Sequence, residues 1–390
     1  MKLKKTIALL AAAVLSLGLL AGCGDEDSSG AASGGTESTS AEETTERLYT
    51  PTGEIRDISS WELVKEMKYG WNLGNTMDAT GPNGVKNETT WQTAETSVYM
   101  VQLLKEAGFN VMRVPVSWGD HMDEDYKVDE AWMNRVREIV DYGMANDMFV
   151  ILNTHHEEWY FPDGKDKEQD EAQLKALWEQ ICEEFKDYDE HLIFEGLNEP
   201  RLRNTAKEWT GGDKKSRETV NEYERVFYDT VRNSGGNNAK RHLMITGYAA
   251  SSSSNCLKAI ELPEGDDKLI VSVHAYLPYS FALDTKGTAE YDPNNSEIPT
   301  LFSVLNELFI SKQIPVIVGE FGSVNKENTE DRITCVTDYL TAAKELGIPC
   351  CWWDNNAVAG GGENFGLMDR NLPPAWYFPE IVEAIQKVYA

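Results

Sequence analysis

The stretch Leu192-Ile-Phe-Glu-Gly-Leu-Asn198-Glu199-Pro200 decides the fold of this chain. Its apolar run carries one interior glutamate and is short enough to be a buried strand. Pro200 cannot donate to a sheet ladder, so we expect the strand to stop there. Pro315-Val-Ile-Val-Gly-Glu320 has the same design. Two carboxylates at the tips of buried strands indicate one shared cleft, because an α/β barrel keeps its chemistry at the carboxyl ends of its strands.

Strand patterns alternate with helical patterns along the rest of the chain. Eight segments are predicted as strands, at 70–74, 110–114, 149–153, 192–197, 243–246, 270–274, 316–319 and 350–353. The predicted helices are 59–68, 93–107, 130–146, 170–185, 217–234, 255–261, 300–311, 329–346 and 379–389. Eight parallel strands alternating with helices can close into a barrel and leave no free edge.

The sequence therefore predicts an α/β fold, a (β/α)8 barrel that forms a single catalytic domain over residues 47–390. Length does not require a second domain, because such barrels fill roughly 250 to 400 residues as one unit. An open, doubly wound sheet is the alternative. It has little support, because no glycine-rich phosphate loop follows the first strand.

The first 46 residues have the composition of a targeting segment and a tether. Residues 1–22 combine a basic start, an apolar stretch too short to span a membrane and small residues before Cys23, as in a bacterial lipobox. Residues 23–46 are rich in Ser, Thr, Gly and acidic residues, so we expect a flexible linker. The prediction is a lipoprotein signal peptide, lipidation of Cys23 and a secreted protein that a lipid anchors to the outer face of the membrane. Ordinary secretion with an incidental cysteine is the alternative.

Composition narrows the possible partners. A formal net charge of −29 argues against nucleic acid, whose phosphates such a surface repels. The five cysteines after Cys23 lack metal-ligand spacing and are interpreted as small buried hydrophobic residues, although one disulfide is left open. His155 and His156 are adjacent and would point to opposite faces of an extended strand. We therefore expect no metal and no other cofactor, and we expect a monomer.

Polar and aromatic side chains gather at the ends of the predicted strands. They are Asn75, Asp78, Arg113, His155, His156, Asn198, Glu199, His274, Tyr276, Glu320 and Trp353. Two carboxyl groups in an aromatic-lined cleft fit glycoside hydrolysis, in which one acid protonates the departing oxygen while the other attacks or positions water. No G-x-S-x-G motif is present, so the serine hydrolase class is not indicated.

An ordered set of motifs resembles glycoside hydrolase family 5. The motifs are Arg113-Val-Pro115, Thr154-His155-His156-Glu157, Leu197-Asn198-Glu199-Pro200, His274-Ala-Tyr276, Gly319-Glu320-Phe321-Gly322 and Trp352-Trp353. The opening Gly70-Trp71-Asn72-Leu73-Gly74-Asn75-Thr76 is similar to that of subfamily 4, a group of bacterial endoglucanases. The resemblance extends from near Leu63 to near Ile385, which is nearly the whole predicted domain.

The resemblance implies a retaining endo-β-1,4-glucanase, a cellulase, with Glu199 as the acid/base and Glu320 as the nucleophile. It also implies that Asn198 bonds the 2-hydroxyl of the sugar and that Arg113 keeps the nucleophile ionised. The other implied roles are a hydrogen bond from Tyr276 to Glu320 or near the ring oxygen, orientation of the carboxyl groups by His155 and His274, a hydrophobic floor at Trp353, and glycone-side contacts from Asn75, Asp78 and His156.

Other readings stay open at this point. A xyloglucanase, licheninase, xylanase or mannanase would use the same scaffold, and a surface lipoprotein that binds glycans without turnover is a third possibility. If the enzyme is retaining, we expect the carboxyl groups of Glu199 and Glu320 to lie roughly 5 to 5.5 Å apart. Burial beside another carboxylate is expected to raise the pKa of Glu199. Trp209 is predicted as a stacking platform, with a packing role at a helix start or lid as the alternative.

Overall fold

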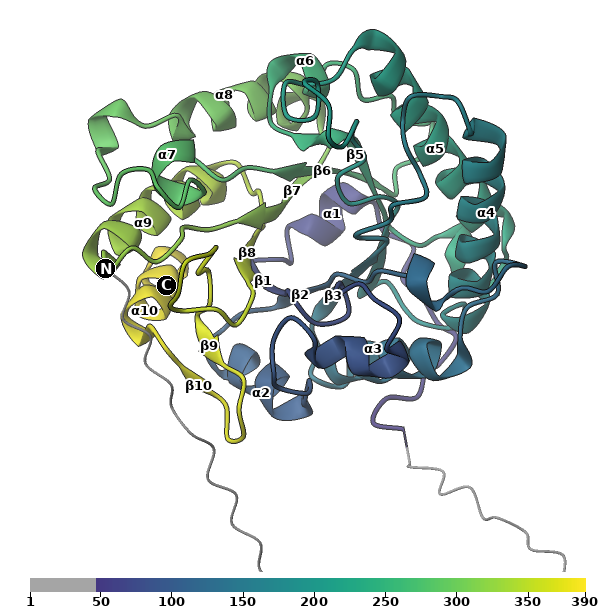
Figure 1. Cartoon of the computed structure of the whole chain (residues 1–390), viewed down its shortest axis with the longest axis horizontal. Coiled ribbons are helices and arrows are strands. Elements are labelled where there is room, and N and C mark those ends of the chain that lie inside the picture. Colours follow the sequence, from purple (N-terminus) through teal and green to yellow (C-terminus); the bar gives the residue numbers. More distant parts are fainter. Residues whose placement is uncertain (1–46) are drawn as a thin grey trace, which may run out of the picture. The chain divides into compact units, whose positions relative to one another are not determined.

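The strands close into the predicted barrel. A computed structural model describes residues 47–390 of the chain. Eight strands pair in sequence order from β1 to β8, and β1 pairs in parallel with both β2 and β8. The helices that follow the first strand lie outside this ring of strands (Figure 1). The (β/α)8 barrel is therefore confirmed, and the open-sheet alternative is wrong because the first and last strands are hydrogen-bonded to each other.

The strand boundaries differ from the prediction at functionally important places. The strands are β1 (Tyr69–Leu73), β2 (Val111–Val114), β3 (Phe149–Asn153), β4 (Leu192–Glu195), β5 (Leu243–Ser251), β6 (Leu269–His274), β7 (Val316–Phe321) and β8 (Cys350–Asp354). β4 ends before Glu199, which lies in the following loop, whereas β7 continues through Glu320. A short antiparallel pair, β9 (Met368–Asp369) with β10 (Ala375–Trp376), was not predicted.

The helices follow the predicted order. They are α1 (Ser60–Val64), α2 (Val98–Glu106), α3 (Glu130–Ala145), α4 (Lys167–Glu184), α5 (Lys214–Asn233), α6 (Ser254–Leu257), α7 (Tyr279–Ala282), α8 (Ile298–Leu308), α9 (Thr329–Glu345) and α10 (Pro379–Tyr389). Short 3-10 helices are η1 (Gly84–Thr89), η2 (Gly119–His121), η3 (Gly236–Ala239), η4 (Pro293–Asn295) and η5 (Ile310–Lys312). α5 begins earlier than predicted because Asp213 and Ser216 form a reciprocal capping box at its start. The short α7 was not predicted.

Helix α1 closes the amino-terminal end of the barrel. In Figure 1 it lies across the ring of strands. Leu63, Val64 and Met67 pack against a layer of inward-facing side chains, namely Val111, Phe149, Ile151, Ile193, Met244, Ile270, Ile317 and Cys351. The capping box of Ser59 and Glu62 sets the start of this helix. With this end sealed by apolar contacts, the polar inward-facing residues lie at the opposite end, where the strands finish.

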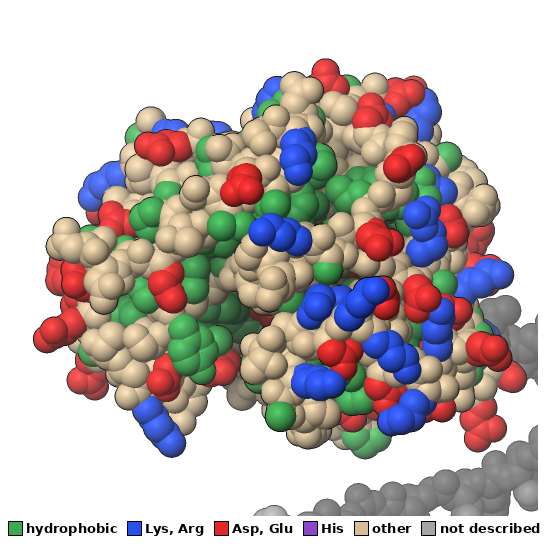
Figure 2. Space-filling model, turned by 90° about the horizontal axis from the view of Figure 1, so that it is seen from above, with side chains coloured by type: hydrophobic (Ala, Val, Ile, Leu, Met, Phe, Trp, Pro, Cys, Tyr) green, Lys and Arg blue, Asp and Glu red, His purple; other side chains and the backbone are tan. Residues whose placement is uncertain are grey.

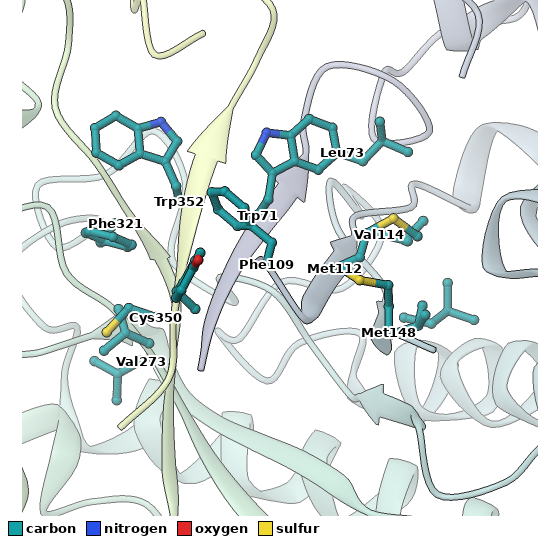
Figure 3. Packing of buried hydrophobic residues seen from close by; sticks show 14 of the residues in the cluster. Trp71, Leu73, Phe109, Met112, Val114, Met148, Val273, Phe321, Cys350 and Trp352 are labelled. Atoms are coloured by element: carbon teal, nitrogen blue, oxygen red, sulfur yellow. The ribbon is translucent and has the colours of Figure 1, made fainter. Parts of the chain in front are cut away.

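Side chains alternate between the two faces of the barrel wall, as the period of two in a strand requires. Trp71 and Leu73 of β1 and Met112 and Val114 of β2 belong to the cluster between the strands and the surrounding helices (Figure 3). The residue between Met112 and Val114 is Arg113, which therefore points into the barrel. This alternation converts each apolar strand into one outward packing face and one inward face that ends in polar groups.

The surface and the cysteines agree with a compact globular domain. Acidic and basic side chains are interspersed over the face shown in Figure 2, with hydrophobic side chains in the hollows between them. Five cysteines are buried and free, so the open possibility of a disulfide is not realised among Cys182, Cys256, Cys335, Cys350 and Cys351. No helix within residues 47–390 combines the length and apolarity that crossing a membrane requires. The predicted signal peptide (1–22), Cys23 and the linker (23–46) lie outside the described residues and stay predictions.

Candidate active site

Arg113 lies at the centre of the polar layer inside the barrel. The side chain is fully buried. Its nitrogens donate to four side-chain oxygens: Nε to Glu195 (2.7 Å), Nη1 to Asn72 (2.9 Å) and Glu320 (2.8 Å), and Nη2 to Asn198 (2.7 Å). Because the guanidinium is a rigid planar fork, it holds these four partners in one arrangement. The structure thus brings Arg113, Asn198 and Glu320 together, as predicted.

Glu195 is a buried carboxylate whose role the motifs did not reveal. Besides the bond from Arg113, it accepts from Asn153 Nδ2 (3.2 Å) and from Ser272 Oγ (2.5 Å). The single positive charge of Arg113 therefore faces two carboxylates, those of Glu195 and Glu320. The sequence did contain a signal: Glu195 follows Ile193 by two positions, so both side chains lie on the inward face of β4.

Glu320 is held by two donors within the cleft. Its Oε1 accepts from Arg113 Nη1, and its Oε2 accepts from the hydroxyl of Tyr276 at 2.8 Å. Burial, followed by the charge of Glu320, raises the pKa of Tyr276 well above its ordinary value, so this hydroxyl keeps the proton that it donates. A carboxylate whose two oxygens are oriented in this way is suited to attack a carbon at a fixed place.

Glu199 faces Glu320 across the cleft. One carboxylate oxygen of each residue and one ring nitrogen of His274 all lie within 4.8 Å of one another. Glu199 Oε1 accepts a hydrogen bond from His274 Nδ1 at 2.9 Å. This close approach of one oxygen from each carboxylate agrees with the close pairing of the two carboxyl groups in retaining enzymes.

The protonation of Glu199 differs from the prediction. Burial by itself raises the pKa of Glu199, but the hydrogen bond and charge of His274, together with the charge of Arg201, outweigh burial and lower it. In His274, burial lowers the pKa, but the charge of Glu320 and the bond to Glu199 outweigh it and raise the pKa. The free enzyme therefore holds the proton of this pair on His274. The prediction treated Glu199 as a carboxyl group beside a carboxylate and overlooked the imidazole between them.

His155 and Trp353 stack on each other where β3 and β8 end, and the predicted role of Trp353 as the floor of the cleft stays a prediction. Their rings are parallel, with centroids 5.7 Å apart and an interplanar angle of 2°. Burial lowers the pKa of His155 well below its ordinary value, so its imidazole is neutral. Gly74 makes room for the indole, because a Cβ at this position would come within 2.8 Å of the Trp353 ring.

The loop after β1 carries the predicted glycone-side residues. Asp78 is fully buried, and its two oxygens accept from the backbone amides of Asn75 (3.0 Å) and Thr76 (2.7 Å). This carboxylate therefore holds the turn in which Asn75 has a positive φ of 59°. A direct bond from Asp78 to a sugar stays a prediction. His156 lies beside this loop and near Trp91, a partly exposed indole 5.5 Å away between ring centroids that the sequence did not single out.

Two more side chains approach the cleft from loops. Trp209 is 64% exposed and stacks on the guanidinium of Arg201, whose carbon lies 4.3 Å from the ring centroid. Glu363 lies in the glycine-rich loop after β8. Burial, followed by the charges of Glu199 and Glu320, raises the pKa of Glu363. No motif marks Glu363, because its approach depends on how this loop folds over the barrel.

Comparisons with known proteins agree with one another. A family model described as cellulase (glycosyl hydrolase family 5) matches residues 74–358. An endoglucanase B of Ruminococcus albus is 57% identical, over 99% of this chain and 97% of the relative. A solved GH5-4 broad specificity endoglucanase from Ruminococcus champanellensis, with bound cellotriose, is 45% identical with a TM-score of 0.83, over 85% of this chain and 99% of that one. A family 5 lichenase from Caldicellulosiruptor sp. F32, in complex with cellotetraose, is 39% identical with a TM-score of 0.81, over 86% and 97%.

Proposed function

This chain belongs to glycosyl hydrolase family 5, and on that premise we propose that Glu199 and Glu320 perform its chemistry. It is a retaining endoglucanase that cleaves internal β-1,4 bonds of β-glucans by double displacement. The observation that carries the residue assignment is the approach of the two carboxylates within 4.8 Å. The partners of each carboxylate differ, because Glu199 bonds an imidazole that can hold a proton and Glu320 bonds a guanidinium that does not release one.

In the first step Glu320 attacks the anomeric carbon while Glu199 gives a proton to the departing glycosidic oxygen. The carbon–oxygen bond to the leaving sugar breaks as the bond to Glu320 forms, which produces a glycosyl-enzyme. In the second step water loses a proton to Glu199 and displaces Glu320. Two inversions at one carbon retain its configuration. Asn198, whose Oδ1 is held by Arg113, presents its amide nitrogen to the 2-hydroxyl of the sugar.

The proton for the first step comes from the pair formed by Glu199 and His274. In the free cleft it lies on the imidazole, which bonds Oε1 of Glu199 at 2.9 Å, and Oε2 is the oxygen that carries the proton once Glu199 becomes a neutral acid. A bound sugar displaces water and buries Glu199 further, which favours the neutral carboxyl group. Substrate binding therefore favours the protonated form of Glu199, which can then act as the acid.

The assignment is tested with Glu199→Ala and Glu320→Ala. We expect both to lose hydrolysis, and we expect azide to restore Glu199→Ala on an activated aryl cellobioside as a β-glycosyl azide. Azide can then attack the glycosyl-enzyme without base assistance. A restored product from Glu320→Ala with the α configuration is expected if azide replaces the nucleophile directly. The reverse pattern of configurations would exchange the two roles.

We further infer that the enzyme accepts several β-1,4-linked polysaccharides. Support comes from the broad specificity endoglucanase and the lichenase to which the chain is similar. Rates on carboxymethylcellulose, barley β-glucan, xyloglucan, xylan and mannan measure this breadth. Hydrolysis confined to xylan or mannan would replace the β-glucan assignment by one of these alternatives. The alternative of a glycan-binding protein without turnover has little support, because both carboxylates and their donors are in place.

We also propose that the mature protein is a monomer that is secreted and held at the outer face of the membrane through lipidated Cys23. The lipobox supports the anchor. The start of the folded domain is compatible with it: Arg47 pairs with Asp141 of α3, and Arg56 pairs with Glu190 just before β4. Asp141 and Glu190 lie just before the starts of β3 and β4, so the chain enters the domain at the end of the barrel opposite Glu199 and Glu320.

A further inference from the structure

Arg201 occupies the space between the catalytic acid and an exposed indole. Its Nη1 donates to the carbonyl oxygen of Glu199 (3.0 Å), and its Nε donates to Glu208 Oε1 (3.1 Å). The guanidinium also stacks on Trp209 at 4.3 Å. Nη1 lies 3.5 Å from Glu199 Oε2, which is a long contact. The guanidinium is thus fixed by three contacts that do not depend on the charge of the acid.

The two oxygens of Glu199 have different neighbours. Oε1 accepts from His274, whose Nδ1 also lies 3.6 Å from Glu320 Oε2. Oε2 faces Arg201 instead. Arg201 and Trp209 therefore lie on the side of Glu199 away from the nucleophile. That side receives the leaving sugar, because the acid protonates the oxygen that departs.

Trp209 provides a surface for that sugar. Its side chain is 64% exposed although it is a large aromatic ring next to the cleft. Indole faces stack on the apolar CH faces of sugars, and a cation fixed against the ring orients it without a further anchor. The loop from Arg201 to Trp209 therefore joins a sugar-stacking surface to the group that contacts Glu199.

We propose that Arg201 is a positioning residue that fixes Oε2 of Glu199 as the proton-donating oxygen and supports Trp209 as the stacking surface of the leaving sugar. This inference rests on the proposed role of Glu199 and adds to it. As the proton leaves, Oε2 becomes negative, and the guanidinium beside it stabilises that charge. The benefit is largest when the departing sugar is a poor leaving group, because such a bond breaks only with proton transfer.

The charge of Arg201 also affects the pH dependence. The ionisable groups that face Glu199 are His274 from β6, His156 after β3, Glu320 from β7, Glu363 after β8 and Arg201 of its own loop. Arg201 is among the groups that lower the pKa of Glu199. Without it this pKa rises, and the pair of Glu199 and His274 keeps its proton to higher pH.

The test is Arg201→Gln in the full chain, with cellopentaose and 2,4-dinitrophenyl β-cellobioside as substrates. We expect kcat/KM on cellopentaose to fall roughly thirtyfold, because removing a donor that stabilises a developing charge costs about tenfold to a thousandfold. On the dinitrophenyl substrate, whose leaving group needs no proton, we expect a loss below about threefold. The alkaline limb on cellopentaose should move to higher pH, because the charge of Arg201 is among the causes that lower the pKa of Glu199.

Three further variants complete the test. Arg201→Lys keeps the charge and should return the alkaline limb to its wild-type position. Trp209→Ala keeps the guanidinium and should raise KM for cellopentaose several-fold with an unmoved limb. Arg217→Gln is the matched control, since this arginine holds the same loop through the carbonyl oxygen of Gly211 (2.7 Å) and should preserve the substrate ratio and the limb.

The outcomes distinguish failure of the role proposed for Arg201 from failure of the roles proposed for Glu199 and Glu320. Equal losses on both substrates, an unmoved alkaline limb, or the same changes in Arg217→Gln would overturn the role of Arg201. The proposed function would still hold in that case, provided that the wild type hydrolyses cellopentaose and Glu199→Ala does not. If Glu199→Ala stayed active on cellopentaose, the proposed function itself would fail.

Discussion

Replacing Glu195 by glutamine removes one of the two buried charges that balance Arg113. The two ion pairs measure 2.7 Å and 2.8 Å, and the side chains are 0% exposed for Arg113 and Glu195 and 7% for Glu320. Breaking a buried pair by removing one partner costs about 3 to 5 kcal/mol. Glutamine keeps an oxygen towards Arg113 Nε, and Glu320 still neutralises the guanidinium, so we expect the lower end, about 3 kcal/mol less free energy of unfolding.

Glu224 offers a matched control. It is also a buried glutamate, on α5, and its Oε1 accepts from the amide of Thr246 at 2.9 Å. Burial, together with the charge of Glu195, raises the pKa of Glu224 well above its ordinary value, so its carboxyl group is neutral near pH 6. Glu224→Gln exchanges one neutral group for another in the folded state and removes a carboxyl group that ionises on unfolding, so we expect this variant to be at least as stable as wild type at pH 6.

The control also has a defined pH dependence. Above about pH 4.3 the carboxyl group ionises in the unfolded state but stays protonated in the folded state. The free energy of unfolding of the wild type therefore falls as pH rises from about 4.3 towards the folded pKa. That loss amounts to about 1.4 kcal/mol per pH unit for one proton. Glu224→Gln removes it, so this variant should become more stable relative to wild type as pH rises above about 5.

The assay is urea unfolding at pH 6, followed in parallel by tryptophan fluorescence and circular dichroism, because coincident transitions justify a two-state fit. We expect Glu224→Gln to be at least as stable as wild type and Glu195→Gln to show the large loss. Equal costs for the two glutamines, or a loss below about 1 kcal/mol in Glu195→Gln, would refute the reasoning that Arg113 is stabilised by sharing its charge between two carboxylates.

Three further predictions concern the cleft and the anchor. Tyr276→Phe removes the 2.8 Å bond to Glu320 and should lower kcat/KM on barley β-glucan by roughly ten- to a hundredfold, the value of a hydrogen bond to a charged group; unchanged initial rates would contradict that role. Cys23→Ala should move the protein from the membrane fraction to the soluble fraction with unaltered activity on soluble glucan, and unchanged membrane retention would exclude the lipobox. Internal cleavage should reduce the viscosity of a soluble β-glucan steeply while few reducing ends appear, whereas nearly constant viscosity with steady release of one small sugar would mean exo action.

Much of the fold was predictable because its signals are local. Short apolar runs separated by helical patterns place the eight strands in order, and strand spacing alone favours a closed barrel. The ordered motifs around Glu199 and Glu320 predicted the family. Boundaries were less predictable. The helix α5 starts earlier than its apolar periodicity indicates, because Asp213 and Ser216 form a capping box that extends the helix towards the amino terminus.

The barrel, the family and the two glutamates that face one cleft can be inferred from local sequence patterns, because alternation along a strand and residues at strand ends are properties of neighbouring positions. How the charges are shared depends on the folded arrangement. Glu195 balances Arg113, His274 takes the proton that was expected on Glu199, and Arg201 joins the acid to Trp209. These side chains come from separate strands and loops, and a pKa or an ion pair depends on which groups meet inside the barrel, at distances that no local pattern encodes.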